Sequence, residues 1–165
     1  MRKIRTLGLK CYSLNDILEN APKIQLDPKA IVLSITSTDS STRPDLIELG
    51  MVGRSEDVLY LKFDDIGREY EVDLNTKREC YGLSEAQAQK FIEWFEEKIT
   101  EDKNLYLHCE AGLSRSQGFV RFILDCYPDI TWLLRLENPC LYPNQHVVST
   151  LKKMWRKKYT PEYES

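Results

Sequence analysis

The sequence has no apolar run that approaches the roughly twenty residues of a membrane-spanning helix, so we predict none. Its N-terminal stretch has basic residues but no continuous apolar core and no small-residue cleavage site, which argues against a secretory signal. The five cysteines never form a Cys-x-x-Cys pair, so we expect neither a disulfide scaffold nor a structural zinc site. These absences predict a cytoplasmic protein whose thiols stay reduced.

An excess of charge of one sign is also missing. The 23 basic and 26 acidic residues give a net charge of −3, which provides no general attraction for nucleic acid. With 42% hydrophobic and 30% charged residues and no internal repeat, the chain does not resemble a disordered, collagenous or coiled-coil protein. Its length of 165 residues predicts one domain over residues 1–165, with residues 158–165 as a frayed tail.

Strand and helix patterns alternate along the chain and predict an α/β fold, in which helices flank a central, mostly parallel sheet. Ser84 followed by Gln87 is a capping-box signature that marks the start of one helix. Two polar segments, 34–46 and 66–82, are predicted as long loops. The predicted strands are 4–9, 30–35, 58–63 and 104–108, and the predicted helices are 13–19, 84–99, 116–126 and 144–158.

The segment LYLHCEAGLSRSQG, from Leu105 to Gly118, contains most of the residues with chemical potential. We predict a strand that ends at His108, a loop from Cys109 to Arg115 and a helix that begins near Ser116. A loop of this kind turns successive backbone N–H groups inward at a helix N-terminus, which favours a tetrahedral dianion. Gly112 permits the close approach that such a loop requires.

The side chains of this segment suit phosphoryl chemistry. The guanidinium of Arg115 offers a planar fork to two phosphate oxygens. The same positive field favours Cys109 as a thiolate nucleophile. Neighbouring strand residues face opposite sides, so His108 is expected to fix the loop through a hydrogen bond rather than to act as a base. The hydroxyl of Ser116 is placed to donate to the sulfur; the alternative for Cys109 is an inert buried cysteine.

The stretch HCEAGLSRS resembles the H-C-x-x-G-x-x-R-S signature of the cysteine-dependent protein tyrosine phosphatases, and the small chain is similar to their dual-specificity branch of bacterial or phage type. The resemblance implies hydrolysis of phosphate monoesters through a phosphocysteine, with protein phosphotyrosine as the leading substrate and phosphoserine or phosphothreonine as others. Neither a metal nor a cofactor is expected, because Arg115 and the loop amides neutralise the phosphoryl group. The phosphate-binding loop would comprise Glu110, Ala111, Gly112, Leu113, Ser114 and Arg115.

The resemblance also implies a general acid on a separate loop after a strand. Asp64 and Asp65 both follow the predicted strand that ends at Phe63. Asp65 matches the family pattern better, and Asp64 is expected to be a turn or cap carboxylate. The connection from Gly67 to Gly82 is longer than in many compact members of the family, which leaves the role of this segment open.

Near the C-terminus, Asn144 and Gln145 are candidates to orient a hydrolytic water, although the simpler interpretation of Asn144 is a helix N-cap. The basic run 152–158 offers an interaction with phosphoinositide or RNA, against the simpler interpretation as a solvated helix face. The alternatives to a protein phosphatase are therefore an RNA 5′-phosphatase, a phosphoinositide phosphatase, or a catalytically silent module that binds phosphate groups. The loop has no lysine, which disfavours phosphoinositides.

Overall fold

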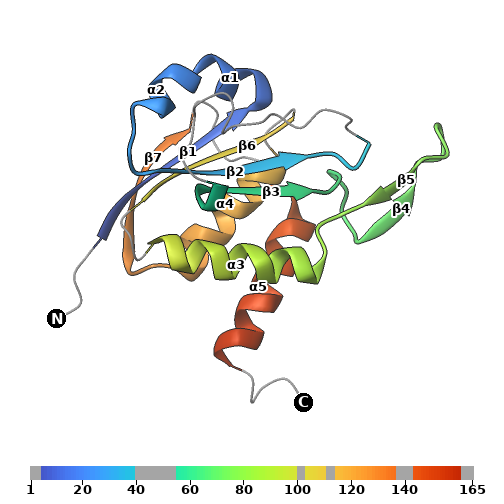
Figure 1. The fold of residues 1–165 in the computed structure, drawn as a ribbon. Coiled ribbons are helices and arrows are strands. Elements are labelled where there is room, and N and C mark those ends of the chain that lie inside the picture. The colour runs from blue at the N-terminus through green and yellow to red at the C-terminus, as the bar shows by residue number, and fades with distance from the viewer. Residues whose placement is uncertain (1–4, 40–54, 100–102, 111–113, 137–142, 161–165) are drawn as a thin grey trace.

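The chain folds into a five-stranded parallel sheet with helices on both faces (Figure 1). The computed structural model describes residues 5–39, 55–99, 103–110, 114–136 and 143–160, and only the backbone of residues 5–7, 55 and 130–136. The strand order is β3-β2-β6-β1-β7, and every pairing is parallel. The strands are β1 (Arg5–Ser13), β2 (Ala30–Thr36), β3 (Val58–Lys62), β6 (Asn104–Cys109) and β7 (Ile130–Leu136).

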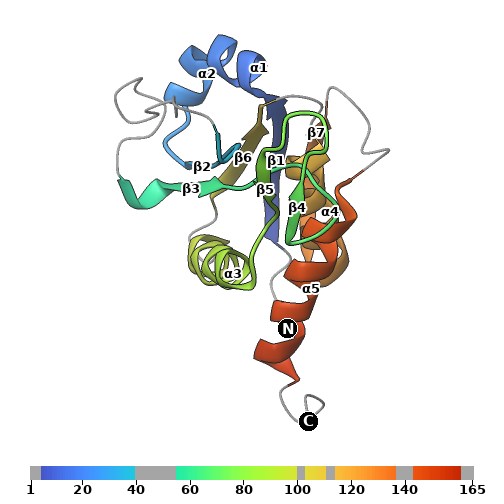
Figure 2. The ribbon, with the colours of Figure 1, turned by 90° about the vertical axis from the view of Figure 1, so that its right-hand side faces the viewer.

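Two short helices cover one face of the sheet and three longer helices cover the other (Figure 1, Figure 2). A small antiparallel hairpin lies beyond the carboxyl ends of β2 and β3 (Figure 1). A single 3-10 turn, η1 (Ser55–Asp57), leads into β3. The short helices are α1 (Leu14–Glu19) and α2 (Ala21–Gln25), the longer ones are α3 (Glu85–Ile99), α4 (Ser114–Cys126) and α5 (Gln145–Tyr159), and the hairpin strands are β4 (Tyr70–Val72) and β5 (Glu79–Tyr81).

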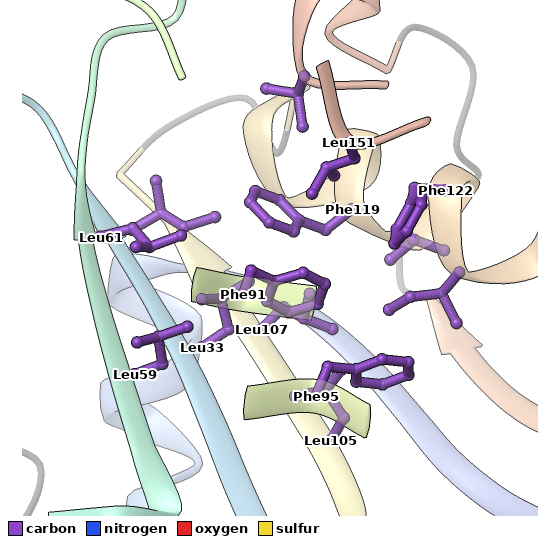
Figure 3. Close-up of a cluster of buried hydrophobic side chains, with 14 of the residues drawn as sticks. Leu33, Leu59, Leu61, Phe91, Phe95, Leu105, Leu107, Phe119, Phe122 and Leu151 are labelled. Carbon is purple, nitrogen blue, oxygen red and sulfur yellow. The ribbon is translucent and has the colours of Figure 1, made fainter. Parts of the chain in front are cut away.

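Successive strand residues face opposite sides of the sheet, which divides the core into two layers. Leu105 and Leu107 of β6 belong to the larger cluster with residues of α3, α4 and α5. Tyr106, between them, packs in a smaller cluster with Ile17 of α1 and Ile24 of α2. The side chains labelled in the larger layer are Leu33, Leu59, Leu61, Phe91, Phe95, Leu105, Leu107, Phe119, Phe122 and Leu151 (Figure 3).

Local sequence signals determine where the longer helices begin and how closely they pack. The predicted capping box before α3 is confirmed, since Ser84 N donates to Gln87 Oε1 at 3.0 Å and Gln87 N donates to Ser84 Oγ at 3.1 Å. Asn144 caps α5 by accepting from Val147 N at 3.0 Å. At Gly118 of α4, an added Cβ would lie 2.7 Å from Val147 Cγ1. The glycine therefore allows α4 to approach the start of α5 closely.

The predicted α/β architecture with a parallel sheet flanked by helices is confirmed. Five details differ from the prediction. Segment 66–82 is not a plain loop but contains the β4–β5 hairpin, and α4 begins at Ser114, so Arg115 already lies in its first turn. Helix α5 includes Lys158 and Tyr159, so the predicted tail cannot begin at residue 158; residues 161–165 lie outside the described part. Helix α2 and strand β7 were not predicted.

None of the helices in the described part of the chain is both long and apolar enough to cross a membrane. The basic run on α5 is engaged in ion pairs with neighbouring elements. Lys152 lies 2.8 Å from a carboxylate oxygen of Asp125 in α4, and Lys153 lies 2.7 Å from one of Glu85 in α3. Lys158 pairs with Glu96 at 2.6 Å. These contacts favour the interpretation of the run as a helix face that packs beside acidic neighbours.

Candidate active site at the carboxyl edge of the sheet

The segments that follow β2, β3 and β6 meet at the carboxyl edge of the sheet. The chain leaves β1 through helices on one face and leaves the adjacent β6 through α4 on the other face (Figure 1). Ligands of parallel α/β sheets bind where neighbouring crossovers diverge in this way. Ser37 links two of these segments, because its N–H and hydroxyl donate to the two carboxylate oxygens of Glu110 at 3.1 and 3.0 Å.

Cys109 ends the central strand β6 and is fully buried. Its Sγ lies 3.4 Å from Ser116 Oγ in the first turns of α4, within hydrogen-bond distance. The thiol of Cys11, from the adjacent strand β1, donates to the same Oγ at 2.9 Å. Either atom of the Cys109–Ser116 contact can be the donor, and Oγ can accept from Cys11 while its own proton points to Cys109 Sγ. This arrangement suits a serine that stabilises a thiolate.

Arg115 is held in place from one end of its guanidinium. Its Nη1 donates to Ser37 Oγ at 3.0 Å and to the Phe63 carbonyl oxygen at 2.8 Å. The residue is only 4% exposed, and its Nε has no hydrogen-bond partner among the described residues. A buried cationic donor without a partner is costly unless a ligand satisfies it, and a phosphate oxygen is a suitable acceptor.

His108 lies on the sheet face opposite to Cys109, as the alternation of the strand predicts. Its Nε2 forms a 2.6 Å hydrogen bond with the hydroxyl of Ser34, the residue opposite it on β2. This bond joins His108 to a neighbouring strand, and residues 111–113 of the loop that His108 was expected to fix lie outside the described part. Burial lowers the pKa of His108 to about 4, so the imidazole is neutral at pH 7.

Asp65 lies beside the first turn of α4. Ser114 Oγ donates to its Oδ1 at 3.1 Å, and Asn144 Nδ2 donates to the same oxygen at 2.7 Å. Nδ2 of Asn144 also donates to the carbonyl oxygen of Ile66 at 3.1 Å. The side chain of Asp65 is exposed, and no described residue donates to its Oδ2. Oδ1 of Asp65 is thus fixed by hydrogen bonds, whereas Oδ2 accepts none from the described residues.

Asp64, the preceding residue, has a different environment. It is 4% exposed and accepts hydrogen bonds from Thr38, Tyr81 and Arg78. Burial alone would raise the pKa of this carboxyl, but the hydrogen bonds from Thr38, Tyr81 and Arg78 outweigh that effect, and the pKa lies below its ordinary value. Asp64 is therefore a charged residue that joins segments of the fold.

The remaining candidates belong to the loop after Cys109 and to the start of α5. Ala111, Gly112 and Leu113 lie outside the described residues. Asn144 uses Oδ1 for the helix cap and Nδ2 for the segment that contains Asp65, so both polar atoms of its side chain have partners. Gln145 is exposed, and its Nε2 donates to the Pro143 carbonyl oxygen at 3.3 Å.

Three contributors to the site were missed by the sequence interpretation. Ser37 holds both Glu110 and Arg115, Cys11 contacts Ser116, and Ser34 pairs with His108. Of these three residues, only Ser37 had a sequence signal. It lies in the Ser- and Thr-rich segment after β2, and long loops at strand ends often contain functional residues. The contact of Cys11 joins residues 105 positions apart, so no local pattern indicates it.

Comparison of the chain with models of protein families gives no match, and comparison with curated proteins gives none either.

Proposed function

We propose that this protein is a cysteine-dependent phosphatase that hydrolyses phosphate monoesters, with protein phosphotyrosine as the leading substrate. The observation that supports this most directly is Arg115, a buried guanidinium fixed through Nη1 whose Nε has no partner among the described residues. It lies one residue before Ser116, which contacts Cys109. A cationic fork, a thiol and a hydroxyl on one strand-to-helix connection suit a phosphoryl dianion.

In the first step, the thiolate of Cys109 attacks phosphorus and forms the S–P bond as the P–O bond to the leaving group breaks. Arg115 and the backbone amides of the loop bind the equatorial oxygens, where charge gathers in the transition state. Asp65 donates its proton to the departing oxygen, which leaves as an alcohol or phenol. Neutral His108 takes no part in proton transfer and supports the strand that ends at Cys109.

In the second step, a water attacks the phosphocysteine, the S–P bond breaks, and inorganic phosphate is released. Asp65, now a carboxylate, accepts the proton of this water. The hydroxyl of Ser116 donates to Cys109 Sγ as the sulfur departs with the electron pair, and Cys11 keeps that hydroxyl oriented by donating to its oxygen. Gln145 is the candidate to orient the water, because the side-chain polar atoms of Asn144 already have partners.

The substrate assignment has support from the surface charges. The lysines of α5 that suggested RNA or phosphoinositide binding are paired with Asp125, Glu85 and Glu96. Glu110 adds a negative charge to the start of the phosphate-binding loop, although Ser37 binds both of its oxygens. We therefore favour a singly phosphorylated side chain over a highly charged inositide or a triphosphorylated RNA end. A thiolate enzyme of this kind also fits a reducing cytoplasm.

The test is phosphate release from a panel of a phosphotyrosine peptide, a phosphothreonine peptide, a phosphoinositide and a triphosphorylated RNA. The variant Cys109→Ser is the blank. We expect turnover of the phosphotyrosine peptide by the wild type and none above background by the variant. Binding of the phosphopeptide without turnover by the wild type would identify a silent binding module instead. Comparable turnover by Cys109→Ser would refute the nucleophile.

A further inference from the structure

The hairpin β4–β5 is tied to the segment that contains Asp65 by contacts in both directions. Asp64 N donates to the carbonyl oxygen of Tyr81, and Tyr81 N donates back to Asp64 Oδ2 at 2.8 Å. Arg78, which leads into β5, donates from Nη2 to Asp64 Oδ1 at 2.8 Å. The hairpin therefore binds the residue immediately before Asp65 through both backbone and side chain.

The base of the hairpin is closed tightly enough to support this contact. Gly82 N donates to the Glu69 carbonyl oxygen at 3.0 Å. An added Cβ on Gly82 would meet the backbone oxygen of Arg68 at 2.2 Å, so only glycine fits against that backbone. The rings of Tyr70 and Tyr81 lie across the two strands, with centroids 5.4 Å apart. The hairpin is thus an ordered element of the fold and not an irregular loop.

The same carboxylate reaches the segment that holds the phosphate-binding arginine. Asp64 accepts from Thr38 N at 3.0 Å and from Thr38 Oγ1 at 2.6 Å, while Arg78 Nη2 donates to the same Oγ1 at 2.9 Å. Thr38 is the neighbour of Ser37, which accepts from Arg115. Arg115 also donates to the carbonyl oxygen of the residue before Asp64. The hairpin, the acid segment and the arginine are therefore connected through hydrogen bonds of neighbouring residues.

We propose that the β4–β5 hairpin is a positioning element for the general acid, in which Arg78 holds Asp64 and thereby keeps Asp65 against Ser114 and Asn144. This inference rests on the proposed function, in which Asp65 protonates the leaving group. Arg78 is a positioning residue because it acts through Asp64 and contacts no atom that reacts. Its loss removes the side-chain contact of the hairpin with Asp64 and so loosens the acid segment, while the bonds between Tyr81 and Asp64 and the bond from Arg115 to the Phe63 carbonyl remain.

The test compares Arg78→Ala with Arg68→Ala, a matched control. Arg68 belongs to the same segment, is exposed and pairs with Glu71 at 3.6 Å, and it has no bond to Asp64. Turnover is measured with aryl phosphates of poor and good leaving groups. Misplacing a catalytic group by about 1 Å costs up to about 10² in rate, so we expect Arg78→Ala to lose about 10- to 100-fold on poor leaving groups.

With a leaving group that needs no proton, Arg78→Ala should lose less than about threefold. Arg78→Lys should recover part of the loss, because a single nitrogen, Nη2, makes both contacts with Asp64 and Thr38. Arg68→Ala should match the wild type with every substrate. A loss in Arg78→Ala that is equal for all leaving groups would overturn the inference, since it would indicate a general structural role.

A second measurement does not depend on catalysis. The amides of Asp64 and Ile66 are hydrogen-bonded, so hydrogen–deuterium exchange of residues 63–66 reports whether the segment is held. Faster exchange in Arg78→Ala but not in Arg68→Ala supports the positioning role. If the wild type is inactive and this exchange difference is still found, the proposed function is refuted while the structural role of Arg78 stands. Exchange equal to that of the control overturns the inference. If Arg78→Ala does not fold, Arg78→Gln replaces it in both measurements.

Discussion

The replacement His108→Gln should change how the stability of the protein depends on pH. Burial lowers the pKa of His108 from 6.5 to about 4. The folded state therefore binds the proton more weakly than the unfolded state. The contribution of neutral His108 to the free energy of unfolding is complete above pH 6.5 and is lost as the pH falls toward 4. At about 1.4 kcal/mol per pH unit, the loss amounts to about 2 kcal/mol between pH 7 and 5 and about 3 kcal/mol by pH 4.

Urea denaturation of the wild type and the variant at pH 7, 6, 5 and 4 measures this effect. Glutamine keeps a polar group for Ser34 Oγ, the hydrogen-bond partner of His108 Nε2, but has no proton to titrate in this range. The variant will be less stable at pH 7, yet its free energy of unfolding should fall less steeply between pH 7 and 5. Parallel pH dependences of the two proteins would show that a buried neutral His108 is not the cause.

Three further outcomes follow from the site and its packing. Arg115→Lys should lower kcat/KM and weaken vanadate inhibition on the order of 10²- to 10³-fold, because a point charge cannot replace the fork; near-normal kinetics would contradict its role in binding phosphate. Asp65→Asn should lower turnover of poor leaving groups by about 10² to 10⁴ and flatten the alkaline limb of the pH profile, and a larger leaving-group-dependent defect in Asp64→Asn would reverse the assignment. Gly118→Ala should lower Tm, since overpacking against Val147, 2.7 Å away, costs about 1–3 kcal/mol and exceeds the helix-propensity gain of up to about 1 kcal/mol; an unchanged or higher Tm would contradict it.

The parts of the fold that local patterns encode could be predicted from the sequence. The capping box of Ser84 and Gln87 fixes the start of α3, and strand alternation places His108 and Cys109 on opposite faces. The strand at Ile130–Leu136 was overlooked, although its sequence ITWLLRL has the β-branched and aromatic residues typical of strands. In that case the signal was present.

The hairpin had no comparable signal. Its strands are three residues long, too short for a repeating alternation, and their apolar residues Tyr70, Val72 and Tyr81 are exposed. Its turn contains Lys77 at a φ of 57°, a conformation for which glycine or asparagine is the usual indication. The contacts that stabilise it, from Arg78 and Tyr81 to Asp64, join residues 14 and 17 positions apart. Tertiary packing, and not local propensity, therefore determines this element.

The environments of two adjacent carboxylates explain how one chain segment can contain both an anchor and an acid. Asp64 faces inward, where donors from Thr38, Tyr81 and Arg78 occupy both of its oxygens and keep its pKa low. A carboxylate in that environment cannot supply a proton at neutral pH. Asp65 is exposed, and the donors to it among the described residues contact Oδ1. Neighbouring groups with such different surroundings can take different roles, and in the mechanism that we propose the charge of Asp64 fixes the segment from which Asp65 acts.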